Sequence, residues 1–526
     1  MKLNYKRTIL VGFAFFLICA FWQAYDNTVP LILTNKFGMS QTWSGVIMAL
    51  DNVLALFMLP LFGHLSDKCT SPKGRRTPFI VIGTLVAACA LVALSFVDNA
   101  QLRHLRDVSA IDDPAALSVI YERQKDATLL SPGGESFILG QKFTEEEFTA
   151  IRSQTVTEDG EAVTDPAYTN YVVPARQACA EAVTRAHPAT VILFVALLLI
   201  ILLSMATFRS PAVALMPDVT PKPLRSRANA IINLMGAVGG ITYLLTAALL
   251  YPNSKTAGVQ HVNYQPLFVA VSLLMAAAVV VLYFTTNEPK LAAAEKEYEA
   301  AHPEQQLVEE EPDGSEELPK EVRRSLVMLL NSIALWYIGY NGVTTWWTTY
   351  VARVMGQGLG GASTCLLVAT GGAIVSYIPV GQLASKIGRK KTIQGGVILL
   401  AACFASAYFL TTHYQSINAV MFVVFALVGL AWAAINVNSL PMVVEMCKGS
   451  DIGKFTGYYY TFSMAAQVVT PILAGTLLKH ISYSMLFPYA AFFVACSFVT
   501  MCFVRHGDCK VEAKAGLAAF EDMDAD

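Results

Sequence analysis

Twelve long apolar blocks run through the sequence and limit what the chain can fold into. Each block has at least the roughly 20 residues that an α-helix needs to cross about 30 Å of hydrocarbon. A helix satisfies its own backbone hydrogen bonds in lipid, so each block is predicted to be helical. With 55% hydrophobic and 14% charged residues, the composition is that of a membrane protein and not of a water-soluble globule. The predicted spans are 9–35, 43–65, 78–97, 189–213, 228–251, 265–285, 324–351, 362–384, 392–412, 417–443, 453–478 and 484–504.

These spans divide the chain into two halves with two polar interruptions. Spans 1–3 fall within residues 1–97, and spans 4–6 fall within 189–285 and complete an N-terminal lobe. Residues 324–504 form a C-terminal lobe of six spans, and 505–526 form a tail. The interruptions are an insert at 98–188 and a linker at 286–323, which mixes helix-forming residues with acidic ones.

Lysine and arginine in the short loops predict the orientation, because these residues resist translocation. They concentrate in alternate loops, at positions Lys2, Lys6, Arg7, Lys68, Lys73, Arg75, Arg76, Lys222, Arg225, Arg227, Lys386, Arg389, Lys390 and Lys391. We therefore expect a multi-pass protein of the cell membrane, with both termini and the linker in the cytoplasm. The insert then lies outside.

Two interpretations of the insert stay open: a small folded cap, or a loosely ordered acidic loop without a binding role. Acidic runs favour the loop. DDPAALSVIYERQK and TEEEFTAIRSQ carry helix-start signals, whereas SPGGES and EDGEAVTDP have the composition of turns.

The two halves show a weak internal repeat. LPLFGHLSDKCTSPKGRR (59–76), after span two, matches IPVGQLASKIGRKK (378–391), after span eight. Asp218 and Glu445 hold equivalent positions after spans four and ten. Such repeats are typical of two-lobed transporters.

The pattern G-x-x-x-D followed by G-R-R between spans two and three resembles the cytoplasmic motif of the major facilitator superfamily. Gly63, Asp67, Gly74, Arg75 and Arg76 carry this motif. FGHLSDKCTSPKGRRTPFIVIG and RSPAVALMPDVTPKPLRSRAN further resemble the branch of sucrose transporters and glycoside-cation symporters. The resemblance covers all twelve spans and omits the insert.

The resemblance implies an all-α membrane fold of two six-helix lobes related by a pseudo-two-fold axis, and transport of a sugar by alternating access. The chain also departs from the branch in span four. Leu202 stands where similar plant members carry an acidic residue, and Val213 stands where they carry an arginine. Coupling by that acidic residue is therefore excluded.

Charged residues at the cytoplasmic helix ends are candidates for a gate. A carboxylate there can pair with guanidinium groups and hold helix ends together in one state. The alternative is that the basic residues only fix the topology. The gate candidates are Gly63, Asp67, Gly74, Arg75, Arg76, Asp218, Arg225, Arg227, Arg389 and Glu445.

Two carboxylates inside the spans are candidates for ion coupling. Asp26 in span one and Asp51 in span two lie about 12 to 15 Å below the outer surface, at about 1.5 Å per residue. A charge at such depth is expensive and marks an ion or substrate path. The pair could share a proton. It could instead bind sodium with the neutral oxygens of Asn27 and Asn52. A third possibility is that each carboxylate only bonds across a helix interface.

Amides and aromatic rings at mid-depth are the candidates for sugar binding, because sugars combine hydroxyl groups with C–H faces that pack on rings. Span seven is the richest in such residues, and its glycines can thin the helix there. The candidates are Trp22, Gln23, Asn27, Asn52, Asn233, Trp336, Tyr340, Asn341, Trp432 and Asn436.

We therefore expect a secondary transporter, a proton-coupled symporter of a sugar or glycoside. Sodium coupling, a drug or lysolipid carrier of the same fold, and a receptor or scaffold that uses the insert are the alternatives. The sequence shows none of the common catalytic motifs, so we do not expect an enzyme. No cofactor or metal site is expected beyond a proton or sodium as coupling ion. The expected partners are a small solute and the lipid bilayer, with no nucleic acid, and the chain is expected to be a monomer.

Overall fold

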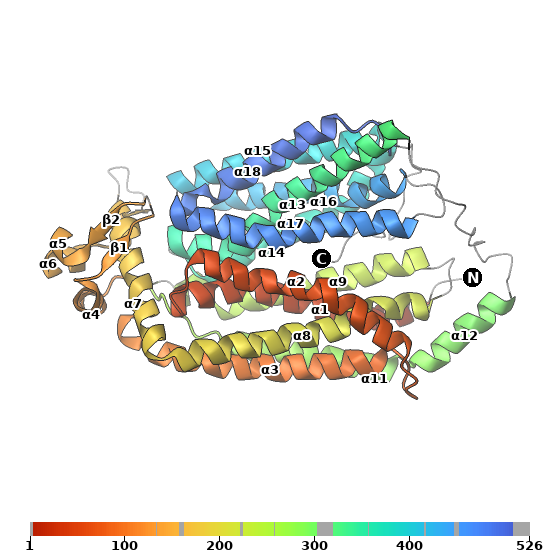
Figure 1. Ribbon diagram of the computed structural model, residues 1–526, viewed down its shortest axis with the longest axis horizontal. Coiled ribbons are helices and arrows are strands. Elements are labelled where there is room, and N and C mark those ends of the chain that lie inside the picture. The colour runs from red at the N-terminus through yellow and green to blue at the C-terminus, as the bar shows by residue number, and fades with distance from the viewer. Residues whose placement is uncertain are drawn as a thin grey trace.

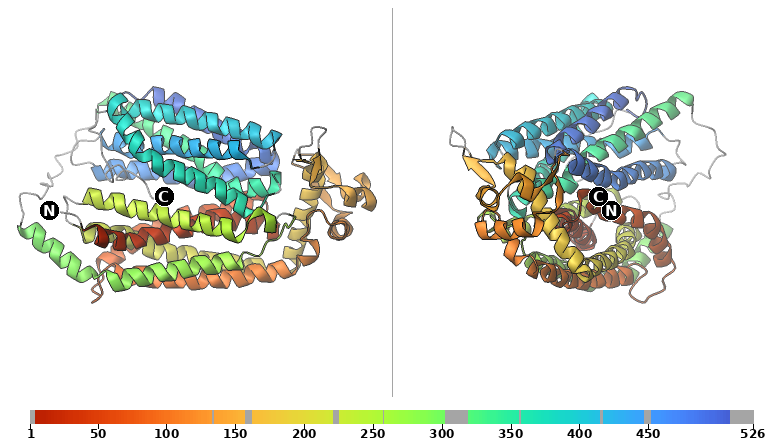
Figure 2. Two further views of the ribbon diagram at one scale, coloured as in Figure 1. Left: turned by 180° about the vertical axis from the view of Figure 1, so that it is seen from behind. Right: turned by 60° about the vertical axis from the view of Figure 1, so that its left-hand side comes forward.

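The computed structural model describes residues 4–508 except 133, 157–161, 221–224, 257, 302–318, 356, 415–416 and 447–451. Twelve helices in these described residues are long and apolar enough to cross a membrane. They form two bundles, which lie one above the other in Figure 1 and are seen from behind in Figure 2. The predicted all-α fold with two six-helix lobes is confirmed.

The N-terminal lobe combines helices from both sides of the insert. Helix α1 packs against α9 and α11, and α3 packs against α8 and α11. A π-helical turn, η1 (Ile32–Lys36), continues α1, and α10 (Asn253–Thr256) follows α9. The six long helices are α1 (Tyr5–Leu31), α2 (Gln41–Asp67), α3 (Thr77–Arg103), α8 (Pro188–Asp218), α9 (Arg225–Leu250) and α11 (Gln265–Thr285).

The C-terminal lobe repeats this arrangement. Helix α13 packs against α17 and α18, and α15 packs against α16 and α18. Helix α12 (Glu288–Ala301) follows the N-terminal lobe at the end of the molecule away from the insert (Figure 1). The lobe contains α13 (Lys320–Val354), α14 (Leu359–Ile387), α15 (Arg389–His413), α16 (Ala419–Val444), α17 (Ile452–His480), η6 (Tyr483–Met485) and α18 (Leu486–Cys502).

Short polar side chains begin several of the long helices. Ser40 accepts a hydrogen bond from the Trp43 N–H at the start of α2, and Asn418 accepts one from Met421 at the start of α16. Within the apolar spans, some hydroxyl groups bond to carbonyls one turn back, as Thr207 does to Leu203 and Thr242 does to Val238. These polar groups are therefore satisfied without water.

Between α3 and α8 the insert folds into short helices and two hairpins. Its elements are η2 (Arg106–Val108), α4 (Pro114–Gln124), β1 (Thr128–Leu130), β2 (Ser136–Ile138), α5 (Leu139–Lys142), α6 (Glu145–Ala150), β3 (Gln154–Val156), β4 (Ala162–Thr164), η3 (Tyr168–Val172) and α7 (Val173–Ala186). Both antiparallel pairs have a defined register, with Leu129 opposite Phe137 and Thr155 opposite Val163. The expected helix-start signals are found, as an Asp113 cap on α4 and a capping box of Thr144 and Glu147 on α6.

A buried core holds the insert together, so it is not the loosely ordered loop that acidic composition favoured. Leu117, Ile120, Phe148 and Val172 are fully shielded from solvent within it. The Arg176 guanidinium lies in the same region and donates to backbone carbonyls, including those of Val108 at 2.9 Å and Ile111 at 2.6 Å. Burial lowers the pKa of this guanidinium from its ordinary value. The strand β4 also occupies part of a stretch that was predicted to be a turn.

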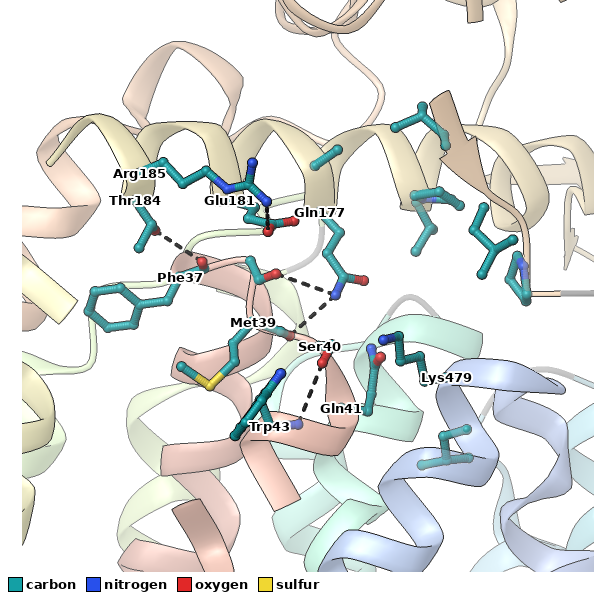
Figure 3. A pocket seen from close by; sticks show the side chains of 18 of the residues that line it. Phe37, Met39, Ser40, Gln41, Trp43, Gln177, Glu181, Thr184, Arg185 and Lys479 are labelled. Atoms are coloured by element: carbon teal, nitrogen blue, oxygen red, sulfur yellow. Dashed lines mark hydrogen bonds and ion pairs between the residues drawn. The ribbon is translucent and has the colours of Figure 1, made fainter. Parts of the chain in front are cut away.

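The insert is fastened to the N-terminal lobe at two places. Helix α7 lies along the corner between α1 and α2, where Gln177 donates to the Met39 carbonyl at 3.2 Å and Thr184 donates to the Phe37 carbonyl at 3.0 Å (Figure 3). A Cβ at Gly38 would lie 2.3 Å from the Glu181 nitrogen, so this corner requires glycine.

The second attachment joins the insert to the link between α9 and α11. The Ile111 N–H donates to Gly258, and the Gln260 N–H donates to Ser109, both at 2.8 Å. These backbone bonds, together with the contacts of α7, make the insert a rigid extension of the N-terminal lobe.

We call the helix ends next to the insert the insert side, and the other ends the opposite side. The two lobes are in close contact on the insert side, where α2 packs against α17 and α9 packs against α14. A Cβ at Gly45 of α2 would lie 2.2 Å from the Pro471 carbonyl oxygen of α17. A Cβ at Gly475 would lie 2.4 Å from the Gln41 carbonyl oxygen. This contact closes the insert side of the lobe interface.

Hydrogen bonds reinforce this closure. Arg353, near the end of α13, donates through Nε to Asn35 Oδ1 at 2.9 Å and through Nη2 to the Thr34 carbonyl at 3.2 Å. Gln41 of α2 donates to the Tyr483 hydroxyl of the C-terminal lobe. Nearby, the Lys36 ammonium lies 2.6 Å from both carboxylate oxygens of Asp98, and this buried ion pair ties the end of α1 to α3. Neither residue of that pair was a predicted site residue.

Candidate functional site

A cavity of about 180 Å³ lies between the two lobes. Helices α1, α2 and α8 form one wall, and α13, α16 and α17 form the other. Its lining residues are Trp22, Gln23, Asp26, Met48, Asp51, Asn52, Arg209, Tyr337, Tyr340, Asn341, Thr344, Thr345, Trp432, Asn436, Gln467 and Pro471. Both coupling candidates and seven of the ten sugar-binding candidates are among them.

Three candidates do not line the cavity. Asn27 is buried beside it, where its amide nitrogen donates to the Gln23 carbonyl at 2.8 Å and to the Gln23 side-chain oxygen at 3.1 Å. Trp336 is fully buried in the core of the C-terminal lobe, and Asn233 is buried in α9. A sequence gives the depth of a residue in a helix more readily than the direction in which it points, and these three point elsewhere.

The N-terminal wall of the cavity is charged. Asp26 and Asp51 lie within electrostatic range of each other, as the common depth predicted. Asn52 donates its amide to Asp51 Oδ1 at 3.0 Å. The wall therefore carries two neighbouring carboxylates in a site shielded by protein.

Arg209 also lies on this wall, although it was not among the predicted site residues. Helix α8 runs past the predicted end of span four to Asp218, although Pro211 and Pro217 lie inside it. The guanidinium carbon of Arg209 is 5.5 Å from the centre of the Trp22 ring, and its charge acts on Asp51. A lone arginine inside an apolar run is the same kind of signal as Asp51, and it could have revealed this residue.

The C-terminal wall carries no charge among its lining residues and is aromatic and amide-rich instead. The Tyr340 and Trp432 rings stack 3.7 Å apart with 6° between their planes, and Tyr337 meets Trp432 edge-on at 5.3 Å. Asn341, Asn436 and Gln467 add amide groups. Stacked rings beside amides are a surface on which a sugar ring can pack and form hydrogen bonds.

Two polar atoms that belong to cavity-lining side chains are buried without a hydrogen-bond partner. They are the Trp22 indole nitrogen, a donor, and Asn436 Oδ1, an acceptor. They come from opposite walls. A ligand with hydroxyl groups can satisfy both, because a hydroxyl both donates and accepts.

A second cavity, of about 170 Å³, adjoins the first between α1, α9, α14 and α16. Both cavities share Trp22, Gln23, Asp26, Tyr340, Trp432 and Asn436. These six residues therefore stand between two small spaces in the centre of the molecule. Cys19 and Tyr377 line only the second cavity.

Four gate candidates of the N-terminal lobe, Asp67, Arg75, Arg76 and Asp218, form one ionic network on the opposite side. Arg75 donates two hydrogen bonds to the Asp218 carboxylate, of 3.0 and 2.6 Å. Arg76 donates to Asp218 at 2.7 Å and also to Asp67. Bidentate pairs of this kind are strong and directional. The network joins the ends of α2, α3 and α8 within the N-terminal lobe.

Glu288 at the start of α12 completes the network, although it was not a candidate. Its carboxylate accepts from the backbone N–H groups of Arg76 and Thr77, where α3 begins. The carboxylate comes so close to Gly74 that a Cβ there would lie 2.2 Å from its oxygen, and Gly74 has a φ of +111°. Gly63 has a related role, since a Cβ on it would lie 2.8 Å from the Ser210 hydroxyl of α8.

The C-terminal lobe has an ion pair at the positions that the internal repeat relates to those of Arg75 and Asp218. Arg389 at the start of α15 pairs with Glu445 after α16 at 2.5 Å, as Arg75 and Arg76 pair with Asp218. The side chains of Arg225 and Arg227 lie outside the described residues. Each described ion pair of this set joins helices of one lobe.

Comparison with known proteins fits this architecture. The sequence model of the Major Facilitator Superfamily matches residues 178–412 and 358–517, more than half of the chain. The chain belongs to this superfamily. A second family model, described as MFS/sugar transport protein, matches residues 11–102. Members of the superfamily are transporters, so this multi-pass membrane protein is not an enzyme.

The curated relatives match over short segments. The sucrose transport protein SUC4 of Arabidopsis thaliana is 39% identical over 59 residues, which cover 11% of this chain and 12% of the relative. The sucrose transport protein SUC3 of the same plant is 37% identical over 67 residues, or 13% of this chain and 11% of the relative. The matches thus span about an eighth of these relatives.

Solved structures match over almost the whole chain at low identity. The inward open xylose transporter XylE from E. coli has a TM-score of 0.58 at 12% identity, covering 97% of this chain and 98% of that one. A D-xylose-proton symporter has a TM-score of 0.56 at 14% identity, covering 96% and 99%. These likenesses support the fold.

Proposed function

We propose that this protein imports a sugar or glycoside together with a proton, by alternating access. The observation that carries the proposal is the central cavity, in which two carboxylates face a stacked aromatic pair. The short matches to sucrose transport proteins point to the same class of solute. The concentration of lysine and arginine in the loops of the opposite side supports an extracytoplasmic insert side.

In this proposal the two walls have different tasks. The C-terminal wall recognises the solute, with its ring packed on Tyr340 and Trp432 and its hydroxyl groups bonded to amides and to Trp22. The N-terminal wall carries the coupling ion, because two neighbouring carboxylates shielded from bulk water can hold one proton between them.

Arg209 connects the coupling ion with the recognition of the solute. When Asp51 is ionised, the guanidinium has a counter-charge beside it. When Asp51 takes up a proton, that attraction is lost. The interactions of the guanidinium with the Trp22 ring and with groups in the cavity then become the stronger ones. The proton acts on Trp22 through Arg209, and the solute bonds to the Trp22 indole nitrogen. The proton and the solute therefore affect the same side chain.

A proton fits these residues better than sodium does. The proposed sodium site required neutral oxygens from Asn27 and Asn52. Asn27 does not line the cavity, and Asn52 turns its amide nitrogen toward Asp51. The nearby guanidinium of Arg209 also repels a second cation.

The described state is closed on the insert side, which is one of the two states that alternating access requires. Opening that side would separate α2 from α17 and break the bonds of Arg353. A drug or lysolipid carrier of this fold and a receptor that uses the insert are the competing functions. The charged and amide-rich cavity favours a hydroxylated solute over a lipid-like one.

Uptake into proteoliposomes tests the proposal. The purified protein should accumulate a labelled sugar when the outside is acidic, and an uncoupler should abolish the accumulation. Asp51→Asn should insert normally and still exchange sugar down its gradient, but should not accumulate it. Glu122→Gln, on the surface of the insert, is the charge-matched control. Full accumulation by Asp51→Asn would remove Asp51 from the mechanism, and silence across a broad sugar panel would reject the substrate class.

A further inference from the structure

A third cavity, of about 250 Å³, lies on the insert side between the insert, the link from α9 to α11 and the end of α13. None of its lining residues belongs to either central cavity. Asp112 and Gln154 at its rim are exposed to solvent, whereas Tyr168 and Arg353 are buried. The cavity thus opens to the solution on the insert side and has a buried floor. Its polar lining is Asp112, Ser153, Gln154, Tyr168, Gln260 and Arg353.

Arg353 at the floor has an unused donor group. Its Nε and Nη2 bond to Asn35 and Thr34, but its Nη1 is buried and has no hydrogen-bond partner. The whole side chain is 4% exposed. A buried charged donor without an acceptor loses its hydration without compensation. A ligand that presents an acceptor in this cavity would restore that bond.

Asp112 at the rim offers the opposite chemistry. Its carboxylate accepts from the Ser153 N–H and from the Ser153 hydroxyl, both at 2.6 Å, and each oxygen keeps further acceptor capacity. Arg176, Asp112 and Arg353 all act electrostatically on the Tyr168 hydroxyl, and Arg176 is itself buried and bonded to backbone carbonyls of the insert. A bare anion is repelled by Asp112, and a bare cation is repelled by Arg353. A neutral molecule with several hydroxyl groups can accept from the guanidinium and donate to the carboxylate.

The size of the cavity agrees with one sugar ring. A cavity of about 250 Å³ has room for several waters, and a single sugar ring is a solute of that order of size. We propose that this cavity is a second, extracytoplasmic sugar site, distinct from the transport path through the centre of the molecule.

The two lobes build this site together. Asp112, Ser153 and Tyr168 belong to the insert, which is fastened to the N-terminal lobe, whereas Arg353 belongs to the C-terminal lobe. When the insert side opens, Arg353 moves away from the other residues and the site comes apart. A ligand bound there therefore stabilises the state closed on the insert side, because it binds that state alone.

This linkage makes external sugar a regulator of its own uptake. The empty carrier must reopen on the insert side before each new import cycle. At ten times its dissociation constant, a ligand of the closed state raises the population ratio of closed to open carrier by a factor of about 11. Uptake should therefore pass through a maximum and fall as external sugar rises. This regulatory role rests on the proposed function, whereas the binding site itself does not.

Equilibrium dialysis of the full-length protein with labelled neutral monosaccharides tests the site directly. We expect two bound molecules per chain, and one in Asp112→Ala and in Arg353→Gln, which remove partners from different lobes. Trp432→Ala should weaken binding at the central site and leave the affinity of the other site unchanged. Glu146→Gln, an exposed acidic residue of the insert outside the cavity, should bind two.

The outcomes separate this proposal from the proposed function. A single site that depends on Trp432 and is indifferent to Asp112 and Arg353 would overturn the second site and leave the transport proposal intact. A single site that depends on Asp112 and Arg353 would uphold the second site and overturn sugar binding in the centre. Asp112-dependent binding of a sugar acid or an amino acid, with no neutral sugar bound, would overturn the assigned ligand, and so would no binding at all.

In uptake assays, inhibition at high external sugar should be absent in Asp112→Ala, and its persistence there would contradict the regulatory role.

Discussion

Gly45→Ala should push the transporter toward the state that is open on the insert side. The added Cβ would lie 2.2 Å from the Pro471 carbonyl oxygen, 2.6 Å from the Pro471 carbonyl carbon and 3.0 Å from Ile472 Cα. All three are backbone atoms of α17, so no side chain can rotate away. The two helices must separate by about 1.2 Å to bring the closest approach to an ordinary contact of 3.4 Å.

The strain acts only in the closed state, where α2 and α17 touch. Overpacking of this kind costs about 1–3 kcal/mol, and every 1.4 kcal/mol changes an equilibrium constant by about tenfold. The ratio of open to closed carrier on the insert side should therefore rise by a factor of roughly 5 to 150. The whole helix bundle need not be destabilised, because the open state carries no strain.

Thiol labelling measures this shift. Cys19 lines the second central cavity, and a membrane-impermeant maleimide added on the insert side reaches it only when that side opens. The labelling rate, followed on the Cys19 peptide by mass spectrometry, should rise in Gly45→Ala. Gly457→Ala in α17 is the matched control, because a Cβ there meets nothing within 4 Å. An unchanged Cys19 rate in Gly45→Ala would refute the view that this helix contact closes the insert side.

Three further perturbations have defined outcomes. Trp432→Ala should weaken central sugar binding about two- to tenfold, since an aromatic stacking contact contributes about 0.5–1.5 kcal/mol beyond its buried area, and unchanged affinity in calorimetry would contradict the assignment. Asp218→Asn should lower the free energy of unfolding by about 1–3 kcal/mol, because it removes the carboxylate that pairs with both Arg75 and Arg76 and leaves the half-exposed Asp67 as the carboxylate partner of the buried Arg76; an unchanged free energy in chemical denaturation would contradict this. Burial, with the charges of Arg176, Lys36 and Arg353, lowers the pKa of His261 to about 3. The folded protein thus keeps this histidine neutral while the unfolded chain protonates below its ordinary pKa of about 6.5, so stability should fall by up to about 1.4 kcal/mol per pH unit from there toward pH 3. His261→Gln should remove that part of the slope in pH-dependent unfolding.

The fold could be read from the sequence because lipid imposes one strong rule on it. Each apolar block had to be a helix. The G-R-R motif and its repeat in the second half predicted two equivalent lobes of six helices. The insert follows no such rule. Its core is assembled from residues far apart in the chain, such as Leu105, Phe148 and Val172, and short elements of this kind leave little periodicity in the sequence.

The candidate site was predictable in depth and less so in direction. Asp26 and Asp51 share a level, as helix rise predicted, and most of the amides and rings at that level do line the cavity. Asn27 follows Asp26 directly, but about 100° around the helix, and so it faces away. Arg209 lies near the predicted end of span four and two residues before Pro211, where an arginine is expected at a helix end, and only the continuation of α8 to Asp218 brings it to the cavity.

The attachment of the insert to one lobe has a mechanical consequence. Because it projects far from the pivot at the centre of the membrane, a small tilt of the N-terminal lobe displaces its outer tip by a larger amount, as the end of a lever moves more than its middle. The distance between a fluorophore on α6 and one at the outer end of α17 should therefore change by more than the lobes move near the membrane centre, and energy transfer between the two can measure it. An antibody fragment that binds the outer tip of the insert should move with the N-terminal lobe and should not block the motion between the two lobes.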